Sequence, residues 1–220
     1  MEKYEFIWSI FGARQHISGS GAAYPFAGGC GANNIADDNP KALAMVDINE
    51  VDTKLNIIMA NLNISPDKFA LFLTYRTYMT DGAPEDLSQC CYLGYHSSDF
   101  SNPANPGQTY GIAVYDNVLF EPDISVLSHE LLEWINDPSG YNLVPAWGNT
   151  GQVSNGCQIN LETGDPFSGS YMPGIMMPNG VTYNSQENAF FSWFMGPVFT
   201  GAGGKLSSNS SFAEAASACN

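Results

Sequence analysis

The chain has 220 residues, and its 22 acidic residues against 7 Lys and Arg give a formal net charge of −15. Binding to nucleic-acid phosphates or anionic membrane surfaces needs clustered Lys and Arg, so this acidic, lysine-poor composition argues against both partners. Hydrophobic residues make up 44% of the chain, which argues against disorder and predicts a packed core. We therefore expect a globular protein that binds neither nucleic acid nor membrane.

The first part of the chain contains one predicted helix and three predicted strands. Residues 1–40, rich in Gly, Ala, Ser and Asn, form an irregular lead-in. Apolar residues at helical spacing predict a helix over 41–62, which Asn39 caps with Pro40 at the first position. Aromatic and β-branched residues predict strands over 69–78, 90–96 and 110–120.

The second part predicts two helices separated by a long irregular region. One helix covers 124–136, with Asp123 placed to cap its start and Pro138 ending it just after Asp137. A Gly-, Pro- and Asn-rich stretch continues to about residue 184, and loops of this length are usually functional or tied down. An aromatic-rich segment, 186–195, predicts the third helix.

Together these elements predict one α+β domain over 41–199, with a small mixed sheet. The tail, 200–220, is small and polar, and Cys219 could anchor it. The five cysteines (30, 90, 91, 157 and 219) are compatible with two disulfides and a spare thiol in an extracellular protein. Cys90 and Cys91 are adjacent, so they can hardly bridge each other without strain, but each could reach a distant partner. The alternative is that all five are small buried hydrophobic residues.

The segment Ser128–Pro138 (SHELLEWINDP) carries the strongest chemical signal. His129 and Glu133 are four residues apart, so on a helix both side chains project from one face and can bind one metal ion. Glu130 lies beside them, where it could polarise a metal-bound water. This H-E-x-x-E arrangement resembles the H-E-x-x-H helix of zinc metallopeptidases, with Glu in place of the second His.

A catalytic zinc site uses three protein ligands, so a third ligand is expected downstream. Glu162 is the first candidate and Asp165 the second, both in the sequence LETGDP, and Asp137 is a further one. Zn²⁺ is the first expectation. Because so many carboxylates would make the site harder than a usual zinc site, Ca²⁺ and Mn²⁺ stay open.

The motif helix also has a simpler interpretation. Its apolar residues form one stripe, which leaves His129 and Glu133 on the opposite face. Any amphipathic surface helix places polar residues there. The pattern alone therefore does not distinguish a metal site from a solvated helix face.

The wider sequence resembles a family of mostly uncharacterised secreted proteins from bacteria and fungi, and distantly the plant phosphate-induced (Exordium-like) cell-wall proteins. The matching segments are CCYLGYH at 90–96, QTY at 108–110, SHELLEWINDP at 128–138, PAWG at 145–148, GQV at 151–153, CQ at 157–158, LETGDP at 161–166, TY at 182–183, QE at 186–187 and FFSWF at 190–194. The chain departs from the pattern at Asn184, where a His is expected after Thr-Tyr; this removes one possible ligand.

The resemblance implies a zincin-like fold, a metallopeptidase-like site and a secreted, extracellular location, although no signal peptide is visible in the chain. The first hypothesis is a metal-dependent hydrolase. Glu130 is its proton acceptor, and His96 lines the cleft or donates a hydrogen bond to a reacting oxyanion. Its substrate is a peptide or protein, to which the strand at 110–120 offers its edge.

The second hypothesis is a non-catalytic extracellular module that recognises a cell-wall or protein surface. In it the same carboxylates hold a structural Ca²⁺ or tie the loop at 138–184 to the motif helix. His96 would then be a hydrogen-bonded, partly buried residue without a chemical role.

Overall fold

The protein is described from a computed structural model. It describes residues 23–24, 43–84, 86, 88, 90–100, 107–115, 123–148, 157–168, 172–196, 202–212, 214–216 and 219. The predicted lead-in is therefore almost wholly outside the described residues, as are Cys30 and the end of the strand expected at 110–120.

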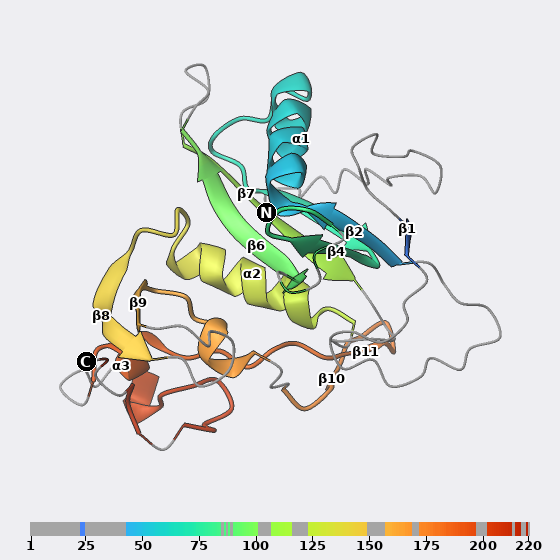
Figure 1. Cartoon of the computed structure of the whole chain (residues 1–220). Helices are drawn as coiled ribbons and strands as arrows, with labels where there is room; N and C mark the ends of the chain where they lie inside the picture. The colour runs from blue at the N-terminus through green and yellow to red at the C-terminus, as the bar shows by residue number, and fades with distance from the viewer. Residues whose placement is uncertain are drawn as a thin grey trace.

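The described chain is an α+β fold with small sheets (Figure 1). In the first sheet the order is β1 (Ala23–Tyr24), β2 (Leu43–Asp47), β4 (Thr77–Thr80), β5 (Cys90–Tyr92). In the second, β7 (Gln108–Tyr115) lies between β3 (Ala70–Tyr75) and β6 (Gly94–Asp99). The second sheet is mixed, because β7 runs parallel to β3 and antiparallel to β6.

The remaining elements are helices and short strands that follow these sheets or connect their strands. They are α1 (Ile48–Asn61), α2 (Ser125–Asn136), β8 (Leu143–Gly148), β9 (Cys157–Asn160), the 3₁₀ helix η2 (Asp165–Phe167), β10 (Ile175–Met176), β11 (Thr182–Tyr183), α3 (Phe191–Phe194) and the 3₁₀ helix η3 (Ala202–Gly204).

The predicted first helix begins too early. Residues 43–47 form β2, which pairs in parallel with β4, and Met45 and Val46 are buried. The helix cap is Asp47 rather than Asn39, since the Asp47 carboxylate accepts a hydrogen bond from the backbone N–H of Asn49 at 2.8 Å. The apolar residues of 43–47 have the same helical spacing as those of α1, so the sequence pattern did not separate strand from helix. Pairing with β4 makes this segment a strand.

Two predicted strands are each divided in the structure. The strand expected at 69–78 breaks at Arg76, whose φ of 51° turns the chain from β3 in one sheet to β4 in the other. The strand expected at 90–96 becomes β5 and β6, again in different sheets.

The predicted third helix is also much shorter, covering only Phe191–Phe194. Ahead of it the chain is extended: Ala189 forms a β-bridge with Ser207, and its N–H donates to Thr163 O at 2.8 Å. Residues 186–188 are buried and polar, so their backbone and side chains pair with other segments rather than with a helix of their own.

Three hydrophobic clusters occur among the described residues. Helix α1 packs through Leu55 on one face of the β3–β7–β6 sheet, while Val126 of α2 packs with Ala113 of β7. A separate C-terminal cluster surrounds Trp147 and Trp193. In Figure 1, α2 therefore lies between the sheet and the C-terminal segments.

The cysteines pair in two ways among the described residues. Cys157 pairs with Cys219 as a disulfide, and the N–H of Cys219 donates to Ala146 O, so the tail is held against β8 and β9. Cys90 pairs with its neighbour Cys91 across a cis peptide bond, with their Cα atoms 3.0 Å apart, although adjacent cysteines were expected hardly to bridge each other. Within the described segments, no helix has the length and apolar character needed to cross a bilayer.

Candidate metal centre

Helix α2 buries its polar face. His129, Glu130 and Glu133 are 7%, 4% and 3% exposed, whereas Ile135 of the apolar stripe is 57% exposed. This is the reverse of a solvated amphipathic helix. Burying three ionisable side chains on one face costs free energy unless each is paired, so the partners of these residues define the site.

The first group of donors surrounds His129. Its Nε2 lies 3.0 Å from Glu133 Oε2 and 3.5 Å from Asp165 Oδ1. Asp165 begins η2, in the LETGDP segment that packs over α2. One ligand atom from each of the three residues lies within 4.8 Å of the others, so they could hold one metal ion.

The other atoms of these three residues are held by neighbouring groups. Glu133 Oε1 accepts hydrogen bonds from the backbone N–H groups of Gly164 (3.0 Å) and Asp165 (3.1 Å). Asp165 Oδ2 accepts from Gln158 Nε2 at 3.0 Å, and His129 Nδ1 lies 3.0 Å from Gln186 Oε1. In each residue, therefore, one side-chain atom is held by neighbouring groups, and the other, which could bind the metal, is directed toward the same point.

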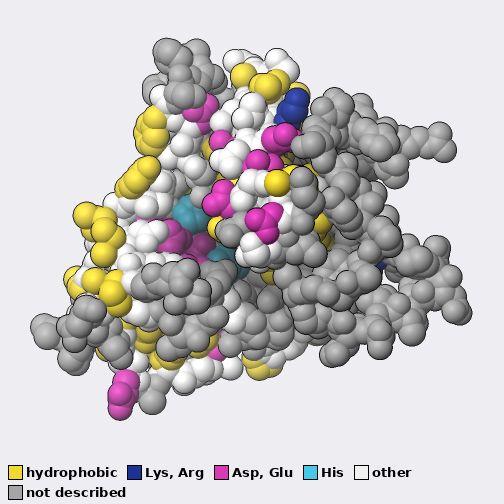
Figure 2. Space-filling view, viewed as in Figure 1, with side chains coloured by type: hydrophobic (Ala, Val, Ile, Leu, Met, Phe, Trp, Pro, Cys, Tyr) yellow, Lys and Arg dark blue, Asp and Glu magenta, His cyan; other side chains and the backbone are white. Residues whose placement is uncertain are grey.

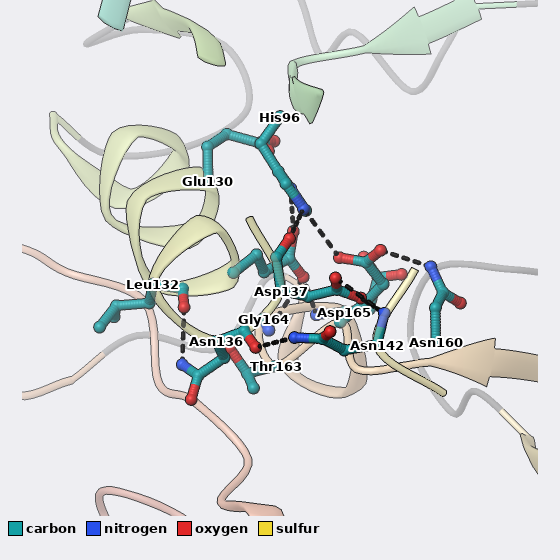
Figure 3. Close-up of polar contacts among 12 residues, drawn as sticks. His96, Glu130, Leu132, Asn136, Asp137, Asn142, Asn160, Thr163, Gly164 and Asp165 are labelled. Atoms are coloured by element: carbon teal, nitrogen blue, oxygen red, sulfur yellow. Dashed lines mark hydrogen bonds and ion pairs between the residues drawn. The ribbon is translucent and has the colours of Figure 1, made fainter. Parts of the chain in front are cut away.

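The second group of donors surrounds His96, in the middle of β6 (Figure 3). His96 Nδ1 lies 3.7 Å from both Glu130 Oε2 and Glu133 Oε2, while Nε2 lies 2.9 Å from Asp137 O. Glu130 is packed closely on Gly94, where an added Cβ would lie 2.5 Å from Glu130 Oε1. His96, Glu130 and Glu133 form the second set of donors within 4.8 Å, so Glu133 belongs to both.

The remaining two predicted ligands have different surroundings. Glu162 faces His96, with Oε2 3.8 Å from His96 Nε2, and this buried oxygen has no hydrogen-bond partner among the described residues. The Asp137 carboxylate accepts from the backbone N–H groups of Tyr141 and Asn142 at 2.9–3.0 Å, which closes the turn after α2 (Figure 3). Of the downstream candidates, Asp165 is thus the one grouped with His129 and Glu133.

The two histidines have raised pKa values. Burial alone would lower the pKa of His96, but the carboxylates of Glu130, Glu133 and Glu162 outweigh it and raise this pKa to about 11. Burial alone would also lower the pKa of His129. The carboxylates of Glu133 and Asp165 favour its charged form and raise this pKa well above the usual value. Without a cation, both imidazoles therefore carry the positive charge that the carboxylates require.

The carboxylates differ among themselves. Burial would raise the pKa of Glu133, but the His129 and His96 charges lower it to about 2. Burial raises the pKa of Glu130. Burial, followed by the Glu133 charge, raises the pKa of Glu162 to about 8. Glu133 is thus strongly ionised, whereas Glu130 and Glu162 hold protons more readily.

The donor set fits a divalent cation. With bonds of about 2.0–2.2 Å and tetrahedral angles, two ligand atoms on zinc lie about 3.3–3.6 Å apart. The separations of 3.0 and 3.5 Å around His129 Nε2 are close to that range. The mixture of imidazole nitrogen and carboxylate oxygen is suitable for Zn²⁺ or Mn²⁺, and additional oxygens would favour Ca²⁺.

The cluster is visible from one side of the molecule. Figure 2 shows histidine and acidic side chains together in a recess on this face, beside hydrophobic side chains. His96 lies on the outermost strand of its sheet, because β6 pairs with β7 and no second strand partner for it occurs in the described chain. The described part of the strand expected at 110–120 lies in β7 between β3 and β6, so residues 110–113 offer no edge, contrary to expectation.

Sequence reasoning assigned no role to Gln158 or Gln186, although both contact the donor groups. Gln186 is 57 positions from His129, and we had placed it in a helix, so no local pattern indicated the contact. Asn184, where a histidine was expected, donates to the Asp123 carboxylate from its backbone N–H and its side-chain amide, both at 2.9 Å.

Comparison of the chain with protein-family models, curated protein sequences and solved structures finds no match. The geometry and chemistry of the cluster are therefore the basis for any assignment of function.

Proposed function

We propose that the protein is a secreted, zincin-like metal-dependent hydrolase that acts on peptides, with its cation held by His129, Glu133 and Asp165. The observation that carries the proposal is the burial of this polar face of α2 with its donor atoms already directed to one point. Hydrogen bonds that fix the non-ligating atoms of metal ligands are typical of metal centres.

The arrangement of elements supports the same proposal. The motif helix is the next described element after the central strand of a mixed sheet, and the outermost antiparallel strand, β6, runs beside the site. An extended peptide could add to the edge of β6 that no described strand pairs with, through main-chain hydrogen bonds close to His96. β6 therefore takes the role that we had expected for the strand at 110–120.

The chemistry follows from the positions of the side chains. A divalent cation held there would lower the pKa of a water molecule and polarise a carbonyl group. Glu130 accepts the proton of the water that attacks the peptide carbon and passes it to the amine as the C–N bond breaks. Burial raises the pKa of Glu130, which makes its carboxylate a better proton acceptor. His96 donates a hydrogen bond to the reacting oxygen from Nδ1, because its Nε2 pairs with the backbone oxygen of Asp137.

A second candidate function is a non-catalytic module in which the cluster is structural. The observation that favours it is that Glu133 Oε1 already ties the LETGDP segment to α2 through two backbone N–H groups. In this case a bound Ca²⁺ would strengthen the same connection without a reaction.

Metal binding by the chelator-treated, full-length protein tests both candidates. We expect calorimetric titration with Zn²⁺, Mn²⁺ and Ca²⁺ to give stoichiometric binding of one of them. Glu133→Gln and Asp165→Asn should weaken it, while Glu50→Gln, at an exposed position of α1, should not. At a cation concentration 100-fold above Kd, the free energy of unfolding should rise by about 2.7 kcal/mol. Absence of binding to all three cations would refute the metal site.

Hydrolysis of a quenched fluorescent peptide library separates the two functions. The hydrolase proposal predicts turnover that requires the cation and falls by about 10²–10⁴-fold in Glu130→Gln, although this variant still binds metal. The module predicts calcium-dependent stability and no turnover in either protein.

A further inference from the structure

Gln186 contacts three parts of the metal centre. It is 4% exposed, and its side-chain Nε2 donates to Gly164 O at 2.6 Å. Its Oε1 lies 3.0 Å from His129 Nδ1, and its backbone N–H donates to Ser128 Oγ at 2.9 Å. One side chain thus joins α2 to the segment that carries Asp165.

These contacts fix which atom of the Gln186 amide faces the histidine. A backbone carbonyl oxygen can only accept a hydrogen bond, so the NH₂ group must face Gly164. The amide oxygen then faces His129, and because it too can only accept, the hydrogen must be on Nδ1.

The position of that hydrogen decides the chemistry of the other ring nitrogen. When a cation replaces the second proton of His129 and Nδ1 keeps its hydrogen, the lone pair is on Nε2, the atom that lies 3.0 and 3.5 Å from Glu133 and Asp165. Gly164 limits the ring from another direction, since a Cβ there would lie 2.7 Å from Nδ1. The ring therefore has little freedom to rotate away from the carboxylates.

We propose that Gln186 is a positioning residue of the metal centre, which selects the Nδ1–H tautomer of His129 and holds Nε2 toward the cation. The inference rests on the proposed metal site. It adds a residue outside the ligand set that controls affinity through His129. Such partners of ligating histidines typically contribute about 10–100-fold to metal affinity.

Two substitutions separate positioning from a merely structural role. Gln186→Met keeps the length of the side chain but removes both the donor and the acceptor. Gln186→Glu keeps an acceptor for the Nδ1 hydrogen but loses the donor to Gly164. Gln108→Met is the matched control, because Gln108 is 3% exposed and donates to backbone carbonyls of Lys68 and Thr109, away from the cluster.

We expect Gln186→Met to bind Zn²⁺ about 10–100-fold more weakly than the wild type, and Gln108→Met to bind it equally well. Gln186→Glu should recover most of the affinity, even though it loses the same bond to Gly164. If Gln186→Glu binds as weakly as Gln186→Met, the residue only ties the loop, and the inference is wrong. Unchanged affinity in both variants also refutes it.

A measurement on the wild type does not depend on the folding of any variant. Long-range ¹H–¹⁵N spectra of the zinc-loaded protein should show a protonated Nδ1 and a metal-bound Nε2 for His129. Metal bound through Nδ1 would overturn the assignment of Gln186 while leaving the metal site intact. Absence of any metal binding by the wild type would instead refute the proposed function, and the role of Gln186 with it.

Discussion

Gly164→Ala should disturb His129 without straining the backbone at the site of the change. Gly164 has φ −85° and ψ −34°, a conformation that alanine adopts readily. An added Cβ would lie 2.7 Å from His129 Nδ1, whereas ordinary contacts begin at 3.4 Å, so the ring or the loop must move by about 0.7 Å (3.4 − 2.7). Metal–ligand distances tolerate only about 0.2 Å, which makes this shift large for the site.

We expect Gly164→Ala to lower the free energy of unfolding by about 1–2 kcal/mol. This is the balance of overpacking, about 1–3 kcal/mol, and the gain from a less flexible unfolded chain, about 0.4–1 kcal/mol. Zinc affinity should fall by about 10–100-fold, as for loss of a group that orients a ligand.

Urea unfolding in the presence of chelator and calorimetric zinc titration measure the two effects separately. Gly148→Ala is the control, because the nearest atom to its added Cβ is Cys219 Sγ at 3.9 Å, an ordinary contact. Equal stability and equal zinc affinity in the two variants would show that His129 is not held against Gly164, and the reasoning would fail.

Three further predictions concern the surroundings of the site. Burial alone would raise the pKa of Glu187, but hydrogen bonds from Ser207, Ser211 and backbone N–H groups lower it. Glu187→Gln should therefore cost about 1.5–3 kcal/mol at pH 7 in urea unfolding, and the difference should disappear as pH falls from about 4.5 through the lower folded-state pKa. Asp137→Ala should lower stability by about 1–3 kcal/mol, because the buried Asp137 carboxylate and its partly buried hydrogen bonds from the backbone N–H groups of Tyr141 and Asn142 are lost; no change would exclude this role. Replacing Cys157 and Cys219, 62 positions apart, by Ser should cost about 4 kcal/mol, and a value near zero would contradict the disulfide.

Local sequence patterns predicted the motif helix well. The expected range of 124–136 differs from α2 by one residue, and the helix ends before Pro138 as expected. The predicted cap was wrong, because Ile124 rather than Asp123 is the cap of α2 and no side-chain hydrogen bond caps the helix, while the Asp123 carboxylate accepts from Asn184. The orientation of α2 could not be predicted in this way. The face of α2 that carries His129 and Glu133 is buried because the segment 161–167, distant in sequence, packs over it.

The predicted helices that were wrong failed for a related reason. Residues 43–47 and 186–190 have helix-compatible sequences, but each pairs with a segment distant in the chain. The partners of a strand or a β-bridge are not encoded in local periodicity, so tertiary pairing overrides local propensity.

The candidate site shows the same limit. The spacing of His129 and Glu133 indicated one face of a helix, and the structure places His96, Glu162 and Asp165 around it. Neither the choice between Glu162 and Asp165 nor the contact of Gln186 could be derived from spacing, because each depends on how a loop folds back over α2.

The hydrophobic clusters on the two sides of α2 suggest how the protein opens. The cluster on the side of the sheet includes Val126 of α2 and Ala113 of β7. The C-terminal cluster includes Trp147 but no residue of α2. Polar contacts from Glu133 and Gln186 join the two parts. In hydrogen-exchange experiments the C-terminal part should open as a separate unit when the cation is removed. Bound cation should merge the two units, so that amide protection in the C-terminal part rises to that of the sheet.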